Sequence, residues 1–411
     1  MPEIVITNVL DRLPLQEAVR TSILSRNWRF TWTLLSQLVF DYKFYRYLPR
    51  KKHGGHLFYK RNLGKLLLQL EGSITKFVLY MPAEEQRGKR NIEYCNTMYA
   101  DIVKDINHWI LFLSTKGIKE FTLINMRPAE PVKLPNHLFL CLGLKHLKLR
   151  NCCLHPVPGF HCFPKLVAFE FDQVTFNDRS CKYGEFITRC CPLLEILKFS
   201  FYTPNGEVKL GEIAKLVNLK SLSLWFCKLG DMVVTSSDII QLVGSLPKLE
   251  TLNVDFILAK AAGDGKRLSA NLRRLKTLEL IGIDLEDDIM VECACDLING
   301  LPNLQTLKMI HVTPCFLLRG GGLLDYSKLV WSIKGNLQLQ YVKFECFSGS
   351  QIELHFIKSL LAYSPLLKEM VIIEEMCGRR RHNNSCRELL KLHRASPIAE
   401  LHFFLICKLN C

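Results

Sequence analysis

The chain has 411 residues, of which 48% are apolar and 23% are charged, and 54 basic against 39 acidic side chains give a formal net charge of +15. This length exceeds what one compact core usually organises, so several domains or an extended repeat array are expected. No apolar run approaches the roughly 20 residues of a membrane helix. The opening residues, MPEIVITNVLDRL, lack the basic start of a secretory signal. A cytoplasmic or nuclear location is therefore predicted.

The cysteine pattern excludes two common uses of cysteine. There are 17 cysteines, an odd number without the regular spacing of a disulfide framework, and no CxxC pair that would suggest a zinc site. Reduced thiols that pack as small apolar side chains are expected instead. No metal site is predicted.

Residues 1–41 contain three short helical patterns. The first has apolar residues at the i, i+3, i+4, i+7 spacing of an amphipathic helix and ends at Pro14, where the second begins. The three stripes are Ile6, Val9, Leu10 and Leu13; then Leu15, Ala18, Val19 and Ile23; and finally Leu24, Trp28 and Trp32. About forty residues bury too little surface to be stable alone. We therefore expect this unit to dock, either on the rest of the chain or on another protein.

The string LPLQEAVRTSILSRNWRFTWTLLSQLVFD resembles the F-box of plant F-box/leucine-rich-repeat proteins. Family F-boxes open with Leu-Pro where this chain has Met1-Pro2, so a shortened start and weakened adaptor binding are expected. The resemblance implies binding to a Skp-type adaptor that links to a cullin and a RING subunit. The implied adaptor-binding residues are Pro2, Ile6, Leu10, Leu13, Pro14, Leu24, Trp28 and Trp32. Leu10, Leu13 and Pro14 are assigned to the interface first, and Trp28 mainly to internal packing.

Residues 42–65 are rich in lysine and arginine interleaved with aromatic residues. Such a segment could bind nucleic acid, or it could be a solvated linker. In the family this stretch joins the F-box to the first repeats, which favours the linker, so nucleic acid is not the expected partner.

The unit LxxLxL recurs along most of the remaining chain. The clear copies begin at Leu144, Leu166, Leu194, Leu219, Leu249, Leu275, Leu304, Leu339 and Leu367, and weaker ones begin at Ile74, Ile118 and Ile398. The spacing is close to that of leucine-rich repeats, in which each unit covers its neighbour and builds a continuous core. We predict an α/β fold in which a small all-α F-box precedes a leucine-rich-repeat solenoid, or horseshoe, over residues 66–335. Some connecting segments should be helical, such as Ser236 to Gly244.

Strand residues that alternate with the core residues should form a concave, ligand-facing surface. At the place after the last apolar residue of the units stand Arg150, Asp172, Ser200, Trp225, Asp255, Ile281, Ile310 and Glu345. Trp225, with Ile281 and Ile310, puts large apolar groups on this face, and tryptophan is a favoured anchor at interfaces. Trp225 either helps to hold a protein target or contacts the chain's own loops. Cys152 and Cys227 fit the buried ninth place of the repeat, where a structural role is expected rather than catalysis.

Residues 336–411 resemble the FBD domain that ends many plant F-box/repeat proteins. The resemblance preserves the order strand, FSG turn, helix, SPLLKEM strand, helix, RASP and strand. It implies a helix over Ile352 to Ala362 and terminal strands that cap the open end of the solenoid.

No catalytic signature occurs in the chain: it has no P-loop, no GxSxG and no HExxH. The family resemblance implies a non-catalytic, substrate-recognition subunit of a Skp-cullin-F-box ubiquitin ligase that holds an unidentified protein target. The alternatives are a repeat-based interaction protein without ligase coupling and, third, a nucleic-acid binder. No residue set requires a cofactor.

Overall fold

The computed structural model describes residues 3–46, 64, 67–81, 92–127, 130–157, 160, 163–176, 187, 191–200, 210–225, 236–255, 274–285, 287–311, 333, 335–375, 389 and 391–406. The chain forms two compact units. Unit 1 comprises Met1–Ile196 with Thr203–Gly206, and unit 2 comprises Leu197–Tyr202 with Glu207–Cys411. No helix in the described part of the chain is long and apolar enough to cross a membrane.

Unit 1 begins with the predicted helical cluster. Helix α1 (Glu3–Leu10) is followed by α2 (Leu15–Arg20), which has Pro14 at its N-cap. The prediction of a third helix along Leu24, Trp28 and Trp32 is wrong. The chain forms the 3-10 turns η1 (Thr21–Ile23), η2 (Arg26–Trp28) and η3 (Thr31–Leu34) in this region. Threonine hydroxyls donate to the carbonyl three residues earlier, at Ala18, Trp28 and Phe30. Such local bonds, together with aromatic and β-branched residues, disfavour a continuous α-helix.

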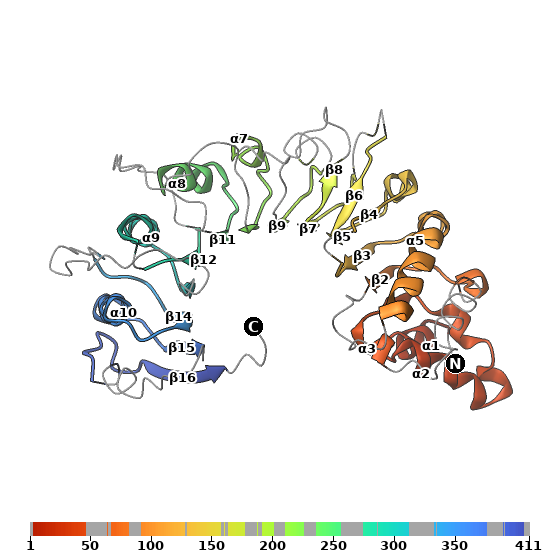
Figure 1. The fold of residues 1–411 in the computed structure, drawn as a ribbon, viewed down its shortest axis with the longest axis horizontal. Helices are drawn as coiled ribbons and strands as arrows, with labels where there is room; N and C mark the ends of the chain where they lie inside the picture. The colour runs from red at the N-terminus through yellow and green to blue at the C-terminus, as the bar shows by residue number, and fades with distance from the viewer. Residues whose placement is uncertain are drawn as a thin grey trace. The chain divides into compact units, whose positions relative to one another are not determined.

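The rest of unit 1 is a parallel sheet with helical connections (Figure 1). Its strands, in spatial order, are β1 (Gln37–Phe40), β2 (Lys76–Met81), β3 (Glu120–Asn125), β5 (His146–Arg150) and β7 (Ala168–Asp172). A second, small sheet contains β4 (Val132–Lys133), β6 (Cys152–Leu154) and β8 (Thr175–Phe176). The connections include α3 (Tyr42–Arg46), α5 (Ile92–Thr115) and η6 (Asn136–Leu140). Of the predicted linker at 42–65, residues 47–63 and 65 lie outside the described residues.

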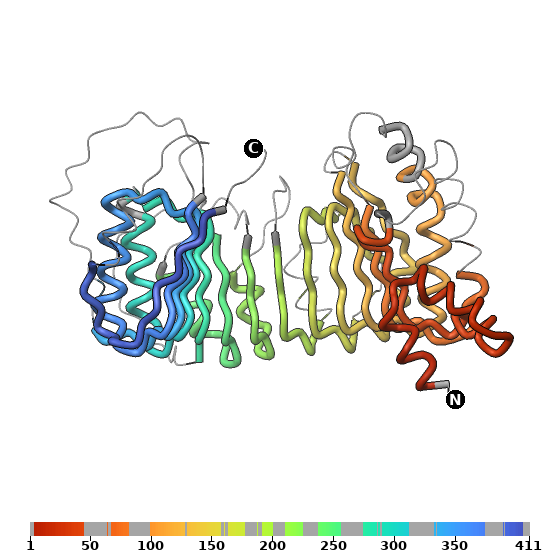
Figure 2. The backbone as a smooth tube through the Cα atoms, turned by 90° about the horizontal axis from the view of Figure 1, so that it is seen from below, coloured from red at the N-terminus to blue at the C-terminus, as the bar shows by residue number. Residues whose placement is uncertain are grey.

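Unit 2 repeats the same strand and helix arrangement. Its strands are β10 (Ser221–Trp225), β11 (Thr251–Asp255), β12 (Thr277–Ile283), β13 (Thr306–His311), β14 (Tyr341–Phe347), β15 (Glu369–Glu375) and β16 (Glu400–Ile406), each parallel to the next. Its helices are α7 (Leu210–Ile213), α8 (Ser236–Ser245), α9 (Asp288–Gly300) and α10 (Gln351–Tyr363). Strand β9 (Ile196–Ser200) spans the unit boundary. In Figures 1 and 2, α9 and α10 lie side by side on one face of these strands.

The strand register confirms the repeat prediction. Every predicted LxxLxL unit forms a strand, and equivalent core residues pair across neighbouring strands. Leu252, for example, pairs with Leu222 on one side and Leu278 on the other. One further unit was missed: β1 carries the same pattern, with Leu35, Leu38 and Phe40 buried and Leu38 paired with Phe77 of β2. The end of the predicted F-box is therefore also the first strand of the sheet.

A repeated turn connects successive units. The carbonyl oxygen of the second residue of one unit accepts the amides of the second and third residues of the next unit. Lys119 O, for example, accepts from Lys145 N at 2.8 Å and His146 N at 3.0 Å. Lys276 O accepts from Gln305 N and Thr306 N at 2.8 and 2.9 Å in the same way. Each turn thus satisfies its amides with the carbonyl of the unit before it.

Four of these strands follow a turn in which a proline comes after a cysteine, leucine or serine, as in Cys191-Pro192 and Ser364-Pro365. At each such turn the amide of the first leucine of the LxxLxL unit donates to the carbonyl of the residue three positions earlier. The proline directly follows the residue that carries this carbonyl. The bonds are Leu194 N to Cys191 O, Leu249 N to Leu246 O, Leu304 N to Leu301 O and Leu367 N to Ser364 O, at 3.1 to 3.3 Å. Proline is favoured at this position of a β-turn because its ring fixes φ near the required value.

The eighth residue of several units adopts a left-handed backbone. Asn151, Gln173, Gly282 and Cys346 have φ of 50°, 52°, 70° and 60°. The last two coincide with a register shift in β12 and β14, where the strand bulges. A bulge breaks the alternation of side chains, so the residues that follow it no longer obey the simple repeat pattern.

The FBD-like residues continue the strand array of unit 2 through β14, β15 and β16. The predicted helix over Ile352 to Ala362 is α10. The RASP segment packs on the SPLLKEM strand, because the buried Ser396 Oγ donates to Leu367 O at 2.6 Å. Of the stretch between β15 and the RASP segment, where a helix is predicted, the structure describes only Leu389 and residues 391–393.

Candidate protein-interaction surfaces

The N-terminal helical cluster exposes several large apolar side chains. The most exposed are Ile23 at 83%, Ile4 at 75%, Leu24 at 68% and Phe30 at 67%, and Val9, Val5 and Leu13 are exposed by 42%, 39% and 38%. Single exposed apolar residues are ordinary, but this many in some thirty residues is typical of a surface that a partner covers.

The predicted adaptor-binding residues differ in how far they are exposed to solvent. Leu24 is open to solvent, and so are Leu13 and Pro14. Ile6, Trp28 and Trp32 are half-buried, and Pro2 lies outside the described residues. Leu10, assigned to the interface first, is instead completely buried within the chain. It is the last residue of α1, and burial there fixes the helix to the rest of the unit. Ile4, Ile23 and Phe30 are equally open but were not among the predicted adaptor-binding residues, although Ile23 directly precedes Leu24.

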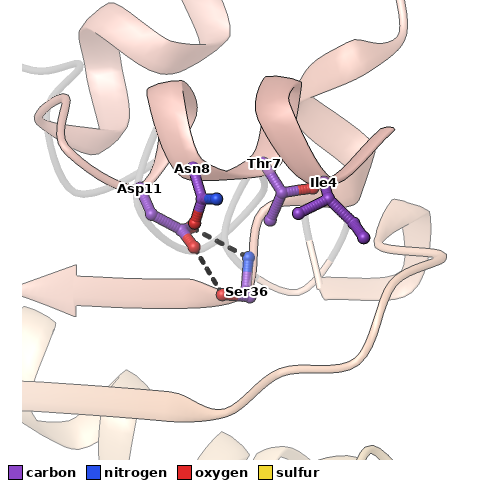
Figure 3. Close-up of a pocket in the computed structure, with 5 residues that line it drawn as sticks. All are labelled: Ile4, Thr7, Asn8, Asp11 and Ser36. Carbon is purple, nitrogen blue, oxygen red and sulfur yellow. Dashed lines mark hydrogen bonds between the residues drawn. The ribbon is translucent and has the colours of Figure 1, made fainter. Parts of the chain in front are cut away.

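A shallow cavity of about 270 Å³ lies between α1 and the start of β1. Its lining residues are Ile4, Thr7, Asn8, Asp11 and Ser36 (Figure 3). The Asp11 carboxylate accepts two hydrogen bonds here, from Ser36 N at 3.1 Å and from Ser36 Oγ at 2.5 Å. These bonds link the helical cluster to the first strand of the sheet.

The outer face of the unit 1 sheet, formed by the strand residues that alternate with the core, has paired charges. The ion pairs join Lys76 to Glu120 at 3.0 Å, Lys148 to Glu170 at 2.9 Å and Arg150 to Asp172 at 3.1 Å. Each joins adjacent strands, and each side chain remains partly exposed. Arg150 and Asp172 therefore lie on the predicted face, but they are neighbours that already neutralise each other. Such pairs add about 0–1 kcal/mol each to stability.

The outer face of unit 2 differs from the prediction at one residue. Asp255 and Ile310 are half-buried strand residues on either side of Ile281. Ile281 is only 6% exposed, so it does not offer the open apolar surface that was predicted. It precedes the bulge at Gly282, and the four consecutive residues Leu280 to Ile283 are buried. Trp225 is the last residue of β10. Cys227 lies outside the described residues.

One lysine and three cysteines have pKa values that their surroundings raise. Lys343 Nζ lies 2.6 Å from Glu345 Oε1 on the outer face of β14, and this hydrogen bond raises the pKa of the lysine. Burial raises the pKa of the Cys141 and Cys295 thiols to about 12, and it also raises the pKa of Cys152. A nucleophilic cysteine needs a lowered pKa, so these three thiols have the environment of structural residues.

Comparisons with known proteins agree with this division of the chain. A family model of the F-box domain matches residues 1–39, and a model of the leucine-rich repeats of FBD-associated F-box protein At5g56370 matches residues 106–243. The F-box/FBD/LRR-repeat protein At1g13570 of Arabidopsis thaliana is 31% identical over 98% of this chain and 97% of its own length. FBD-associated F-box protein At5g56370, from the same plant, is 25% identical over 62% of this chain and 52% of its own length.

A solved structure, an internalin from Listeria monocytogenes, aligns at 14% identity and a TM-score of 0.35 over 74% of this chain and 83% of its own length. That TM-score is too low to add to the fold assignment, which rests on the strand register and the family matches.

The helical cluster and the repeated parallel strands together define a leucine-rich-repeat protein with an N-terminal F-box. The identity to At1g13570 over nearly its whole length shows that the chain belongs to the F-box/FBD/LRR-repeat family. F-box domains in general bind Skp-type adaptors, and proteins of this family are generally non-catalytic.

Proposed function

We propose that this protein is the substrate-recognition subunit of a Skp-cullin-F-box ubiquitin ligase. The observation that carries the proposal is the set of exposed apolar side chains on the F-box, above all Ile23 and Leu24. Covering them with an adaptor would remove apolar surface from water at about 25 cal/mol per Å². The chain would supply no catalytic group. It would raise the local concentration of a target beside the ubiquitin-carrying subunits, to which the adaptor connects.

Within this proposal the adaptor contacts are Leu13, Pro14 and Leu24, with Ile6, Trp28 and Trp32 supporting them from half-buried positions. The proposed domains are an F-box at 1–41, a linker at 42–65, repeats at 66–335 and an FBD segment at 336–411 that closes the array. In support of that closure, β14, β15 and β16 are the last strands in the order of the described sheet. A cytoplasmic or nuclear location, common among F-box proteins, accompanies the proposal.

The double variant Leu13→Ala/Pro14→Ala tests ligase coupling. Both side chains are exposed, so their truncation should leave the fold intact while adaptor copurification falls severalfold. Proximity labelling should then show targets whose steady-state level rises in the variant, and proteasome inhibition should remove this difference by raising the same targets in the wild type. If the wild-type protein retains no Skp-type adaptor, the proposal is wrong, and a repeat-based interaction protein without ligase coupling replaces it.

For the target, we propose contacts on the outer strand face of each unit, at Arg150 and Asp172 in unit 1 and at Trp225, Asp255 and Ile310 in unit 2, without the buried Ile281. Trp225→Ala should reduce capture of the labelled targets by roughly 30-fold, since an interface hot spot contributes at least about 2 kcal/mol. Tyr363→Ala, at a partly exposed aromatic residue of α10, is the control and should leave capture unchanged. If Trp225 packs on the chain's own loops, the variant would instead lower the free energy of unfolding and leave target capture intact.

A further inference from the structure

Asp11 stands where the F-box meets the first repeat strand. It follows α1 directly, and its side chain is half-buried. Figure 3 shows the carboxylate pointing at Ser36, which lies just before β1. One oxygen accepts from Ser36 N at 3.1 Å and the other from Ser36 Oγ at 2.5 Å.

Ser36 is the second residue of the first LxxLxL-type unit. In later units the amide at this place donates to a backbone carbonyl of the unit before it. The equivalent bonds are Thr75 N to Ser36 O, Lys119 N to Thr75 O, Lys145 N to Lys119 O and Glu250 N to Lys220 O, each at 2.8 Å. Among the described strands, β1 is first in the sheet order, so no earlier unit offers Ser36 such a carbonyl.

We propose that the Asp11 carboxylate replaces the carbonyl of a preceding repeat and thereby fixes the F-box to the repeat array. A carboxylate suits this place, because a charged acceptor makes a stronger hydrogen bond than a neutral one and has a second oxygen for the serine hydroxyl. Asp11 thus directly follows α1, and its side chain caps the first repeat turn.

The consequence rests on the proposed ligase function. A receptor that works by proximity is effective only if the target is held at a defined distance from the ubiquitin-carrying subunits. Rigid attachment of the adaptor-binding helices to the repeats narrows the range of those distances. Asp11 would therefore be a positioning residue, without touching adaptor or target.

Other bonds across the same junction should keep the fold when Asp11 is changed. Gln16 Nε2 donates to Phe44 O at 3.2 Å, and Glu71 N donates to Thr33 O at 3.0 Å. Loss of the Asp11 carboxylate should loosen the junction and leave both sides folded.

The test uses the full chain bound to a Skp-type adaptor, carrying a donor and an acceptor dye on non-natural residues at the exposed positions Glu17 and Lys145. Asp11→Ala should broaden the distribution of dye-to-dye distances and accelerate amide exchange at Ser36 by tenfold or more, with adaptor affinity within about twofold of the wild-type value. Asp11→Asn keeps a carbonyl for the Ser36 amide and should restore most of that protection. Ser36→Ala removes only the hydroxyl bond and should cause a smaller broadening.

Unchanged exchange and an unchanged distance distribution in Asp11→Ala would overturn the proposal. If Asp11→Ala unfolds the F-box, adaptor binding is lost, and the milder Asp11→Asn and Ser36→Ala variants decide. If amide exchange at Ser36 were then equally fast in Asp11→Asn, in Ser36→Ala and in the wild type, the proposal would be overturned. Failure of the proposed ligase function would appear separately, as absence of adaptor binding by the wild-type chain, in which case exchange and distances are measured on the chain alone.

Discussion

Replacing Leu24 with aspartate is expected to weaken binding of a Skp-type adaptor by roughly ten- to a hundredfold. Leu24 is 68% exposed, so the change removes little internal packing. Burying a leucine side chain in an interface contributes about 1.5–3 kcal/mol, and a carboxylate at the same place would also have to be desolvated. Titration of the purified adaptor against the full-length chain, by calorimetry, measures the loss.

The chain offers a matched control for this variant. Ile398, in the turn before β16, is 67% exposed, and Ile398→Asp makes the same change of an open aliphatic residue to a carboxylate in unit 2. Its adaptor affinity should stay within about twofold of the wild-type value. Equal losses in the two variants would show a general effect of added negative charge on this basic protein, and the adaptor site would have to be sought elsewhere.

The repeats were predictable from the sequence because the register of a strand is fixed by its buried side chains. A slip by one residue would expose the whole core set of leucines, so LxxLxL can adopt only one pairing with its neighbours. β1 was missed although it has the same pattern, because Leu35, Leu38 and Phe40 also belong to the segment that resembles the end of an F-box. The two descriptions share residues, and the structure shows that one segment serves both.

The errors occurred where local chemistry overrides periodicity. Trp28 and Trp32 have helical spacing, but the threonine hydroxyls and aromatic residues around them favour 3-10 turns. Ile281 has the position of an exposed strand residue, but the bulge at Gly282 ends the alternation directly after it. Helix α5 is a different case: it was not predicted, although its periodicity agrees with the structure, in which Ile102, Ile106 and Ile110 recur at intervals of four and are buried.

The partner surfaces were less predictable than the fold. Leu10 and Leu13 belong to one predicted helical stripe, yet α1 ends at Leu10, which is fully buried, and Leu13 lies exposed in the turn that follows. Periodicity gives the apolar side of a helix, but it does not divide that side between the chain's own core and a partner. This division depends on where other segments end, and it needs the three-dimensional structure.

The second large effect is expected at Glu353, in the FBD-like segment. Its side chain is completely buried, and its carboxylate accepts from Ser348 N at 3.1 and 3.0 Å, from Ser348 Oγ at 2.8 Å and from Ser350 N at 3.0 Å. Glu353 N donates in return to Ser350 Oγ at 3.2 Å, which completes a capping box at the start of α10. His311 of β13 adds a further contact, with Nδ1 3.5 Å from Glu353 Oε1.

Glu353→Ala should therefore lower the free energy of unfolding of unit 2 by roughly 2–4 kcal/mol, because it leaves two partly buried backbone amides without their acceptor and removes half of the cap. Glu353→Gln keeps the side-chain volume and one carbonyl acceptor, so its loss should be smaller. Urea unfolding gives the magnitude, and hydrogen exchange over residues 348–363 shows whether the loss begins at α10. Lys358→Ala, at an exposed position of the same helix, should change stability by no more than about 0.5 kcal/mol. Equal stability of Glu353→Ala and Lys358→Ala would mean that the capping box does not hold the helix against the FBD strands.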